Sequence, residues 1–110
     1  MAAGTYNITL DQGSDFEISL AVSGQDLSGF TARGQIRPTP QSDILYGEFD
    51  FTISSPTSTG GTIAMSLPSF VSRNIPPGTF VYDVEVRNDS TRKAVRLIQG
   101  NITVVQGVTR

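Results

Sequence analysis

Apolar and polar residues alternate along most of this chain, in short blocks separated by turn-forming residues. Such alternation is the period-two pattern of strands that place one face in a core and the other in solvent. We therefore predict strands whose inward positions are, in chain order, Tyr6, Ile8 and Leu10; Phe16, Ile18, Leu20 and Val22; Ala32, Gly34 and Ile36; Leu45, Gly47, Phe49, Phe51 and Ile53; Ile63, Met65 and Leu67; Phe80, Tyr82, Val84 and Val86; and two further blocks, 95–98 and 102–105.

The segments between these blocks are rich in Gly, Pro, Asn, Asp and Ser, which favour turns. A single helical turn is expected over 69–74, ended by the prolines that follow. Seven or eight short strands at this spacing predict one all-β domain over 1–110, a sandwich of antiparallel strands. Its core is predicted to contain Phe16, Ile18, Leu20, Ile36, Phe49, Phe51, Ile63, Leu67, Phe80, Tyr82, Val84 and Ile102.

The last two predicted strands form a hairpin, and their side chains suggest its register. If Arg87 lies opposite Ala94, then Glu85 faces Arg96 on the outer surface, which is a favourable cross-strand pair. This register is our prediction for the hairpin.

In that register, Val95 and Leu97 point inward. Ile102 and Val104 are equally apolar but have the opposite parity along the strand. Because one extra residue in a strand inverts this parity, we predict a β-bulge near Gly100.

The composition bears on chemistry. The chain has no cysteine, so disulfides and thiolate metal sites are excluded, and no histidine, the commonest general base and metal ligand. We therefore predict a protein that is not an enzyme, with no cofactor, no metal site and no catalytic residues. Charged residues make up only 16% of the chain, and Lys93 is the single lysine beside seven arginines. Lysine depletion is typical of surfaces buried against partners, although ordinary compositional drift also explains it.

Two acidic pairs lie on outer faces of predicted strands, Glu48 with Asp50 and Asp83 with Glu85. A glycosidase needs two carboxylates that face each other across a cleft, whereas these pairs share a strand. We interpret them as solvated groups, or as partners of arginines such as Arg33 or Arg96. The oxygen-rich segment 11–15 lacks the further acidic ligands of a calcium loop and is interpreted as a turn.

The distribution of charge and hydropathy limits the partners. The net charge is −2 and no basic run is present, so we expect no nucleic-acid partner. The first residues do not have the pattern of a signal peptide, and no apolar run approaches the roughly 20 residues that span a bilayer. We expect no membrane association and synthesis in a cytoplasm.

Five segments together resemble a known family: YNITLDQG at 6–13, DLSGFTARGQIR at 26–37, PGTFVYDVE at 77–85, GNITV at 100–104 and VTR at 108–110. In this order the chain resembles small virion proteins of tailed phages, frequent in marine and cyanobacterial phages. It is also similar to the immunoglobulin-like N-terminal domain of phage baseplate upper proteins. The resemblance is collinear over nearly the whole chain.

The resemblance implies an immunoglobulin-like β-sandwich and a structural role in the virion. Expected partners are other virion proteins, of the capsid, neck or tail and baseplate, with many copies in each particle. Head decoration or cement, a neck adaptor and a baseplate adaptor remain open. Baseplate upper proteins continue into a stalk and receptor-binding region that this sequence does not contain, so receptor binding is not implied.

Two of these segments have a direct physical interpretation. Leu27 and Phe30 would cap the sandwich around a turn at Ser28 and Gly29. Phe80 falls where immunoglobulin folds place their tyrosine corner, and a phenylalanine cannot make the phenolic hydrogen bond.

The alternative function is a carbohydrate-binding or adhesive immunoglobulin-like module. Such a module would use exposed aromatic rings, and Tyr46 is the one aromatic residue that the pattern places on the outside. The sequence alone does not decide between this alternative and a virion subunit.

The chain ends are the predicted assembly contacts. Strands begin and end within a few residues of the termini, and an extended end can add to a neighbour's sheet edge through main-chain hydrogen bonds. Small residues there would permit close approach, and a terminal arginine would pair with a partner carboxylate. Short ends of no consequence are the alternative. The predicted contacts are Ala2, Ala3, Gly4, Val108, Thr109 and Arg110.

Overall fold

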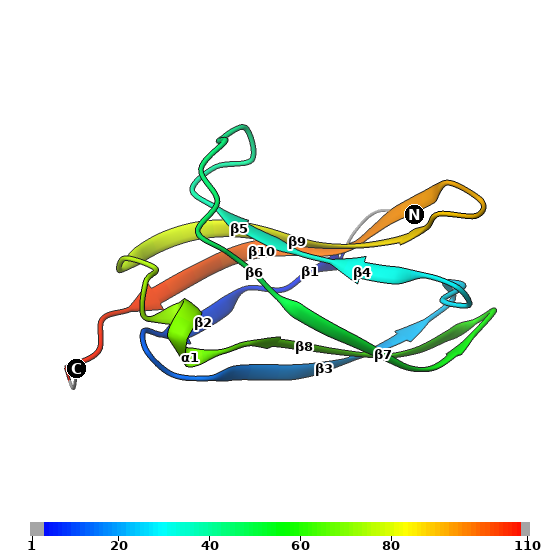
Figure 1. Cartoon of the computed structure of the whole chain (residues 1–110), viewed down its shortest axis with the longest axis horizontal. Helices are drawn as coiled ribbons and strands as arrows, with labels where there is room; N and C mark the ends of the chain where they lie inside the picture. The colour runs from blue at the N-terminus through cyan, green and yellow to red at the C-terminus, as the bar shows by residue number, and fades with distance from the viewer. Residues whose placement is uncertain (1–3, 109–110) are drawn as a thin grey trace.

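Two β-sheets pack face to face in the computed structural model, which describes residues 4–108 (Figure 1). The large sheet contains β1 (Gly4–Thr5), β2 (Ile8–Asp11), β10 (Lys93–Val105), β9 (Gly78–Asn88), β4 (Thr31–Arg33), β5 (Gln35–Arg37) and β6 (Gly47–Glu48). The small sheet contains β3 (Phe16–Ser23), β8 (Gly60–Leu67) and β7 (Asp50–Thr57). The protein is therefore an all-β sandwich, as the alternation predicted.

The strand order is that of an immunoglobulin-like fold. The small sheet, β3-β8-β7, corresponds to strands B, E and D, and β5, β9 and β10 correspond to C, F and G. The pairing differs from the prediction in one respect, because β1 and β2 run parallel to β10 while the other pairs are antiparallel. The first strands thus lie on the large sheet and not beside β3.

The register of the β9–β10 hairpin is confirmed. Arg87 lies opposite Ala94, and Glu85 lies opposite Arg96. The ion pair nevertheless forms with a different carboxylate, since Arg96 Nε lies 3.1 Å from Asp83 Oδ2.

A bulge inverts the parity of β10, as predicted, but not near Gly100. The register shifts between Arg96 and Ile98, so that Leu97 is the extra residue. Ile98 then faces Val84, and the apolar positions beyond it fall on the inner face. The bulge lies at Leu97 because both neighbouring side chains pack inward there, Leu97 against the cluster around Leu27 and Ile98 against the main core.

Gly100 has a different role, which is to admit a crossing chain. A Cβ added there would overlap the Tyr6 carbonyl oxygen, so no side chain fits. The link between β1 and β2 passes over this point. Tyr6 N–H donates to the Gln99 carbonyl at 3.0 Å, and Asn101 N–H donates to Asn7 Oδ1 at 3.0 Å.

The Tyr82 side chain bonds to the same crossing from the core side. Its ring is buried in the core, and its hydroxyl donates a hydrogen bond to the Tyr6 carbonyl. Burial raises the pKa of the Tyr82 phenol from 10.0 to about 12, and the neighbouring Tyr6 phenol adds to the rise. This bond joins residues 76 positions apart, so it is not the local hydrogen bond of a tyrosine corner, which Phe80 cannot make.

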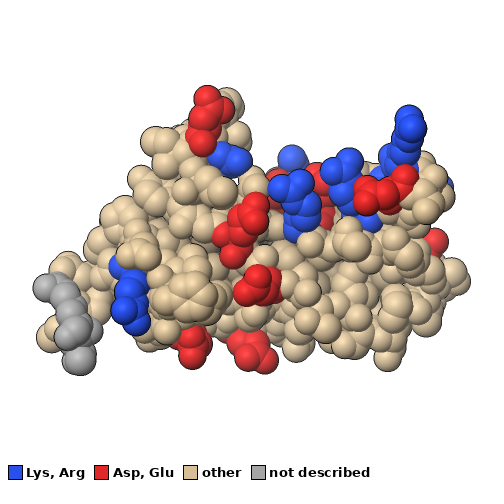
Figure 2. All heavy atoms as spheres, in the orientation of Figure 1, with Lys and Arg blue, Asp and Glu red and all other residues tan. Residues whose placement is uncertain are grey.

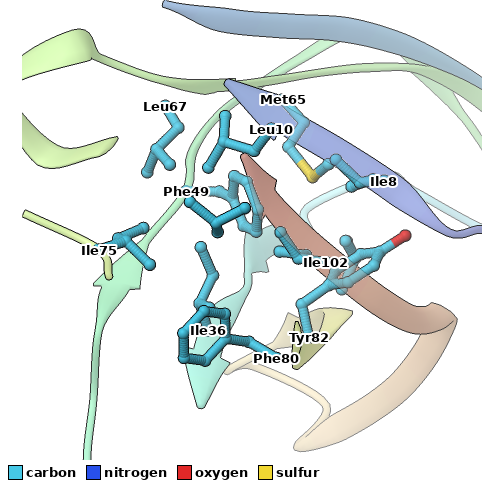
Figure 3. Packing of buried hydrophobic residues seen from close by; sticks show 12 residues of the cluster. Ile8, Leu10, Ile36, Phe49, Met65, Leu67, Ile75, Phe80, Tyr82 and Ile102 are labelled. Atoms are coloured by element: carbon cyan, nitrogen blue, oxygen red, sulfur yellow. The ribbon is translucent and has the colours of Figure 1, made fainter. Parts of the chain in front are cut away.

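The core lies between the two sheets (Figure 3). Eight of the twelve predicted core residues are buried: Ile36, Phe49, Ile63, Leu67, Phe80, Tyr82, Val84 and Ile102. The other four are only half-buried, because they lie on the outer strands of the small sheet: Phe16, Ile18, Leu20 and Phe51. Ile75, which the strand pattern did not include, is fully buried after the helix α1 (Ser69–Ser72).

Leu27 and Phe30 close one end of the core, as predicted. Leu27 is fully buried and Phe30 packs against the same cluster. Phe30 N–H donates to the Leu27 carbonyl at 3.2 Å across the turn, and Gly29 has a φ of 74°, which glycine adopts without strain.

The strand predicted from Leu45 to Ile53 is two strands in different sheets. Leu45 precedes them in an exposed loop, β6 belongs to the large sheet and β7 to the small one. The chain crosses between the sheets at Phe49, whose N–H donates to the Gly34 carbonyl at 3.0 Å. Alternation continues through the crossing, so periodicity alone does not reveal it.

The first prediction compares two phenylalanines. Phe80→Ala removes a ring that is 6% exposed, and we expect the free energy of unfolding to fall by about 3–5 kcal/mol. Phe70→Ala removes a ring that is 66% exposed, with an expected change within about 0.5 kcal/mol. Denaturant titration of both variants checks this. Equal losses for the two variants would contradict the assignment of Phe80 to the core.

The second prediction concerns alkaline pH. Because Tyr82 has a higher pKa when folded than the ordinary 10.0, the folded state retains a proton that the unfolded state loses. The stability that the raised pKa of Tyr82 contributes is fully present below pH 10 and is lost as the pH rises toward 12. We expect the free energy of unfolding of the wild type to fall over this window more steeply than that of Tyr82→Phe, which lacks the titrating group. If the free energy of unfolding falls equally steeply with pH in the two proteins, this prediction is contradicted.

Candidate interaction surfaces

The predicted terminal contacts are described only in part. Gly4 pairs with Ile98 in β10, and a Cβ at Gly4 would make an ordinary contact, 3.7 Å from Ile98 Cγ2. Val108 lies beyond β10 and is 96% exposed. Ala2, Ala3, Thr109 and Arg110 lie outside the described residues. Gly4 is thus engaged within its own sheet, while Val108 is accessible.

The outer face of the large sheet forms a shallow polar trough of about 710 Å³. Figure 2 shows charged side chains gathered over this face, between the loop before β6 and the β9–β10 hairpin. One row crosses three strands, with Glu85 of β9 opposite Arg33 of β4 on one side and Arg96 of β10 on the other. The trough therefore presents alternating charges, with little net charge.

Side-chain bonds order one side of this trough. Arg37 donates to Gln35 Oε1 at 2.7 Å, and Gln35 Nε2 donates to Glu48 Oε1 at 2.6 Å. Arg33 NH2 lies 3.8 Å from the same Glu48 oxygen. Each acidic pair found in the sequence thus supplies one carboxylate to an ion pair with an arginine: Glu48 pairs with Arg33, and Asp83 pairs with Arg96.

Tyr46 does not lie on the outside, contrary to the expectation from its position in the pattern. Its ring packs edge-on against Phe80, with centroids 4.9 Å apart, and it contacts the main core. The strand expected to carry it outward begins only after it, because β6 starts at Gly47. Tyr46 is therefore part of the core boundary and not a platform for a sugar ring.

The oxygen-rich segment 11–15 is a structural turn. Ser14 N–H donates to the Asp11 carbonyl at 3.1 Å, and the Asp15 carboxylate accepts the Ser69 N–H at 2.7 Å, at the start of α1. Across residues 4–108 no three acidic, histidine or cysteine side chains group as metal ligands. In the same range no helix is long and apolar enough to cross a membrane.

Large apolar side chains are exposed at the end of the sandwich that carries α1. We call this surface the α1 end. It comprises Phe70, Val105 and Val108, whereas Ile44 and Leu45 are exposed in the loop before β6.

Hydrogen bonds hold the end of β10 near the segment that follows α1. Gln12 N–H donates to the Val105 carbonyl at 2.9 Å, and its side-chain amide donates to the Ile75 carbonyl at 2.9 Å, just after α1. A Cβ at Gly47 would lie 3.2 Å from Val71 Cγ1, so the start of β6 also lies close to α1.

Sequence reasoning missed this surface, although a signal was present. Phe70 is a large apolar residue that belongs to no block of period-two alternation. An apolar residue that fits no strand either fills a gap in the core, as Ile75 does, or remains exposed, as Phe70 does. The pattern alone does not distinguish these outcomes.

Neither a protein-family model nor a curated protein matches the chain. Solved structures match it in fold. InlP from Listeria monocytogenes aligns at 16% sequence identity with a TM-score of 0.50, covering 94% of this chain and 28% of InlP. A family 123 glycoside hydrolase from Clostridium perfringens aligns at 13% identity with a TM-score of 0.45, covering 97% of this chain and 24% of the enzyme. The chain thus spans only about a quarter of each of these proteins, and the likeness to InlP is one of fold alone.

Proposed function

We propose that this chain is a non-enzymatic structural subunit of a tailed-phage virion, which acts through contacts with other virion proteins. The collinear sequence resemblance supports the virion, and the exposed α1 end supports the contacts. The proposal includes many copies in each particle, synthesis in the host cytoplasm and a place in the head, neck or baseplate.

The α1 end is the observation that carries this proposal. Single exposed apolar residues are ordinary on protein surfaces, but several at one end of a small domain mark an interaction site. Phe70 is 66% exposed, and Val105 and Val108 add aliphatic side chains at the same end. Aromatic residues are enriched where interfaces are most buried, so Phe70 is the expected anchor.

The third prediction tests the α1 end in particles. Mass spectrometry of purified virions of the phage that encodes this chain should detect it. Phe70→Asp should lower the incorporation of the chain into virions, because burying an unpaired carboxylate in the contact is unfavourable. Ser90→Asp, in the β9–β10 hairpin at the far end of β9, is the matched control and should incorporate normally.

Absence of the wild-type chain from purified particles would contradict the virion proposal. Equal incorporation of the two aspartate variants would contradict the role of the α1 end. The terminal contacts stay a prediction, and deletion of residues 108–110 tests the C-terminal one in the same assay.

The polar trough favours a second candidate function, the binding of an oligosaccharide. Ligand sites are concave and present a few well-placed polar groups. Here arginine, glutamine and carboxylate side chains stand on adjacent strands, which lie about 4.8 Å apart, and supply both donors and acceptors for neighbouring hydroxyl groups. The bonds from Arg37 through Gln35 to Glu48 hold part of this array in place.

The fourth prediction tests this second candidate on the isolated domain. If the trough binds sugars, the domain should bind members of an array of bacterial surface oligosaccharides. Arg33→Ala and Gln99→Ala should each weaken that binding about tenfold, since each removes hydrogen bonds worth about 1–2 kcal/mol. Lys93→Ala lies outside the trough and should have no effect. A domain that binds no oligosaccharide would contradict this candidate.

A further inference from the structure

The small sheet has an open edge at β3. This strand has eight residues and pairs with β8 on one side, in continuous register from Phe16 opposite Leu67 to Ser23 opposite Gly60. Within residues 4–108 no strand pairs with its other side. Figure 1 shows β3, in blue, along the lower margin of the molecule. In constant-type immunoglobulin sandwiches the first strand covers this position, whereas here β1 and β2 lie on β10.

The β3 edge lacks the features that normally prevent strands from pairing between molecules. Natural edge strands are blunted by proline, lysine, bulges or short length. The sequence of β3, FEISLAVS, has no proline and no basic residue, and its ladder has no bulge. Its single charged residue is Glu17. Its free N–H and C=O groups are therefore available to another strand.

The inner face of β3 is also incompletely covered. Its four inward side chains, Phe16, Ile18, Leu20 and Val22, are all half-buried. In the neighbouring strand β8, three inward side chains are fully buried: Ile63, Met65 and Leu67. A further strand beside β3 would cover apolar surface in addition to satisfying its main chain.

We infer that β3 pairs antiparallel with β3 of a second copy of this chain, about a two-fold axis at Ser19. Residues directly opposite each other in an antiparallel pair share a face of the sheet. A symmetric pair must therefore place a residue opposite its own copy.

The axis at Ser19 covers the most apolar surface. It places Phe16 opposite Val22 and Ile18 opposite Leu20, so that all four inward side chains have apolar partners. An axis at Leu20 would place Phe16 opposite Gly24, which lies beyond the end of the strand. An axis at Ile18 would likewise place Val22 opposite a residue outside the strand.

Charge and size on the outer face agree with this register. Glu17 lies opposite Ala21, so the only charge on β3 does not face its own copy. The other outward residues of the strand are Ser19, Ala21 and Ser23, which are too small to obstruct a neighbour. The product is a continuous sheet with three strands from each copy. This inference does not rest on the virion assignment, and a strand from a different protein is the competing occupant.

The absence of cysteine allows a direct test of the register with the purified chain. Ser19→Cys places two thiols directly across the axis, and mild oxidation should link the copies. Ala21→Cys is the matched control on the same strand and face. Its two thiols would be separated by four residues of strand, roughly 13 Å, beyond the ~7 Å that a disulfide tolerates between Cα atoms. We expect Ser19→Cys to form dimer at least about tenfold faster than Ala21→Cys. Equal rates, or no dimer from Ser19→Cys, would overturn the inference.

Sedimentation measurements on the full chain, without any cysteine, provide the second test. The wild type should associate to a dimer as its concentration rises. Ser19→Lys places two cations opposite each other and should weaken association at least about tenfold, with unchanged thermal unfolding at low concentration because position 19 is exposed. Ser19→Thr should still associate. A wild type that stays monomeric, or cross-linking of Ser19→Cys to a different protein in particles, would overturn self-pairing.

Discussion

The rest of the structure depends on one constraint, the parity of the long strand β10. It pairs with β9 along one edge and with β1 and β2 along the other, so both halves of the strand must present apolar side chains to the core. A regular strand would turn either Val95 or Ile102 outward. The bulge at Leu97 removes this conflict by changing the parity once, between Arg96 and Ile98.

The second half of β10 then determines where the N-terminal strands lie. Once Ile98 is inward, Gly100 is inward too, and its missing side chain leaves room for the link between β1 and β2. The Tyr82 hydroxyl reaches the carbonyl of Tyr6 at the same point, so the crossing is bonded from the core side. The parallel pairing of the first strands with β10 follows from these contacts. Hence β3 has a neighbour on one side only among the described strands.

Much of the fold follows from local patterns, and the departures have physical causes. The register of Glu85 opposite Arg96 was predictable because it depends on nearest neighbours in one hairpin. The link over Gly100 and the crossing at Phe49 were not, since each joins segments whose contact depends on where other strands lie. Gly100 did signal a special position, but a bulge and a close chain approach both require a glycine. The α1 end was hidden for a similar reason, because Phe70 and Ile75 look alike in sequence and differ only in what packs over them.

The two long sides of the sandwich differ in what they offer to another molecule. On one side the chain crosses between the sheets at Phe49, and β4 contacts β7, so the sheets are joined there. On the other side β2 and β3 are both outer strands. The inward side chains of β2, Ile8 and Leu10, are already buried, so a further strand beside β2 would gain only main-chain hydrogen bonds. The inward side chains of β3 are half-buried, and a strand beside it would gain both hydrogen bonds and apolar burial. Of the two edges, β3 is therefore the one at which pairing is favoured.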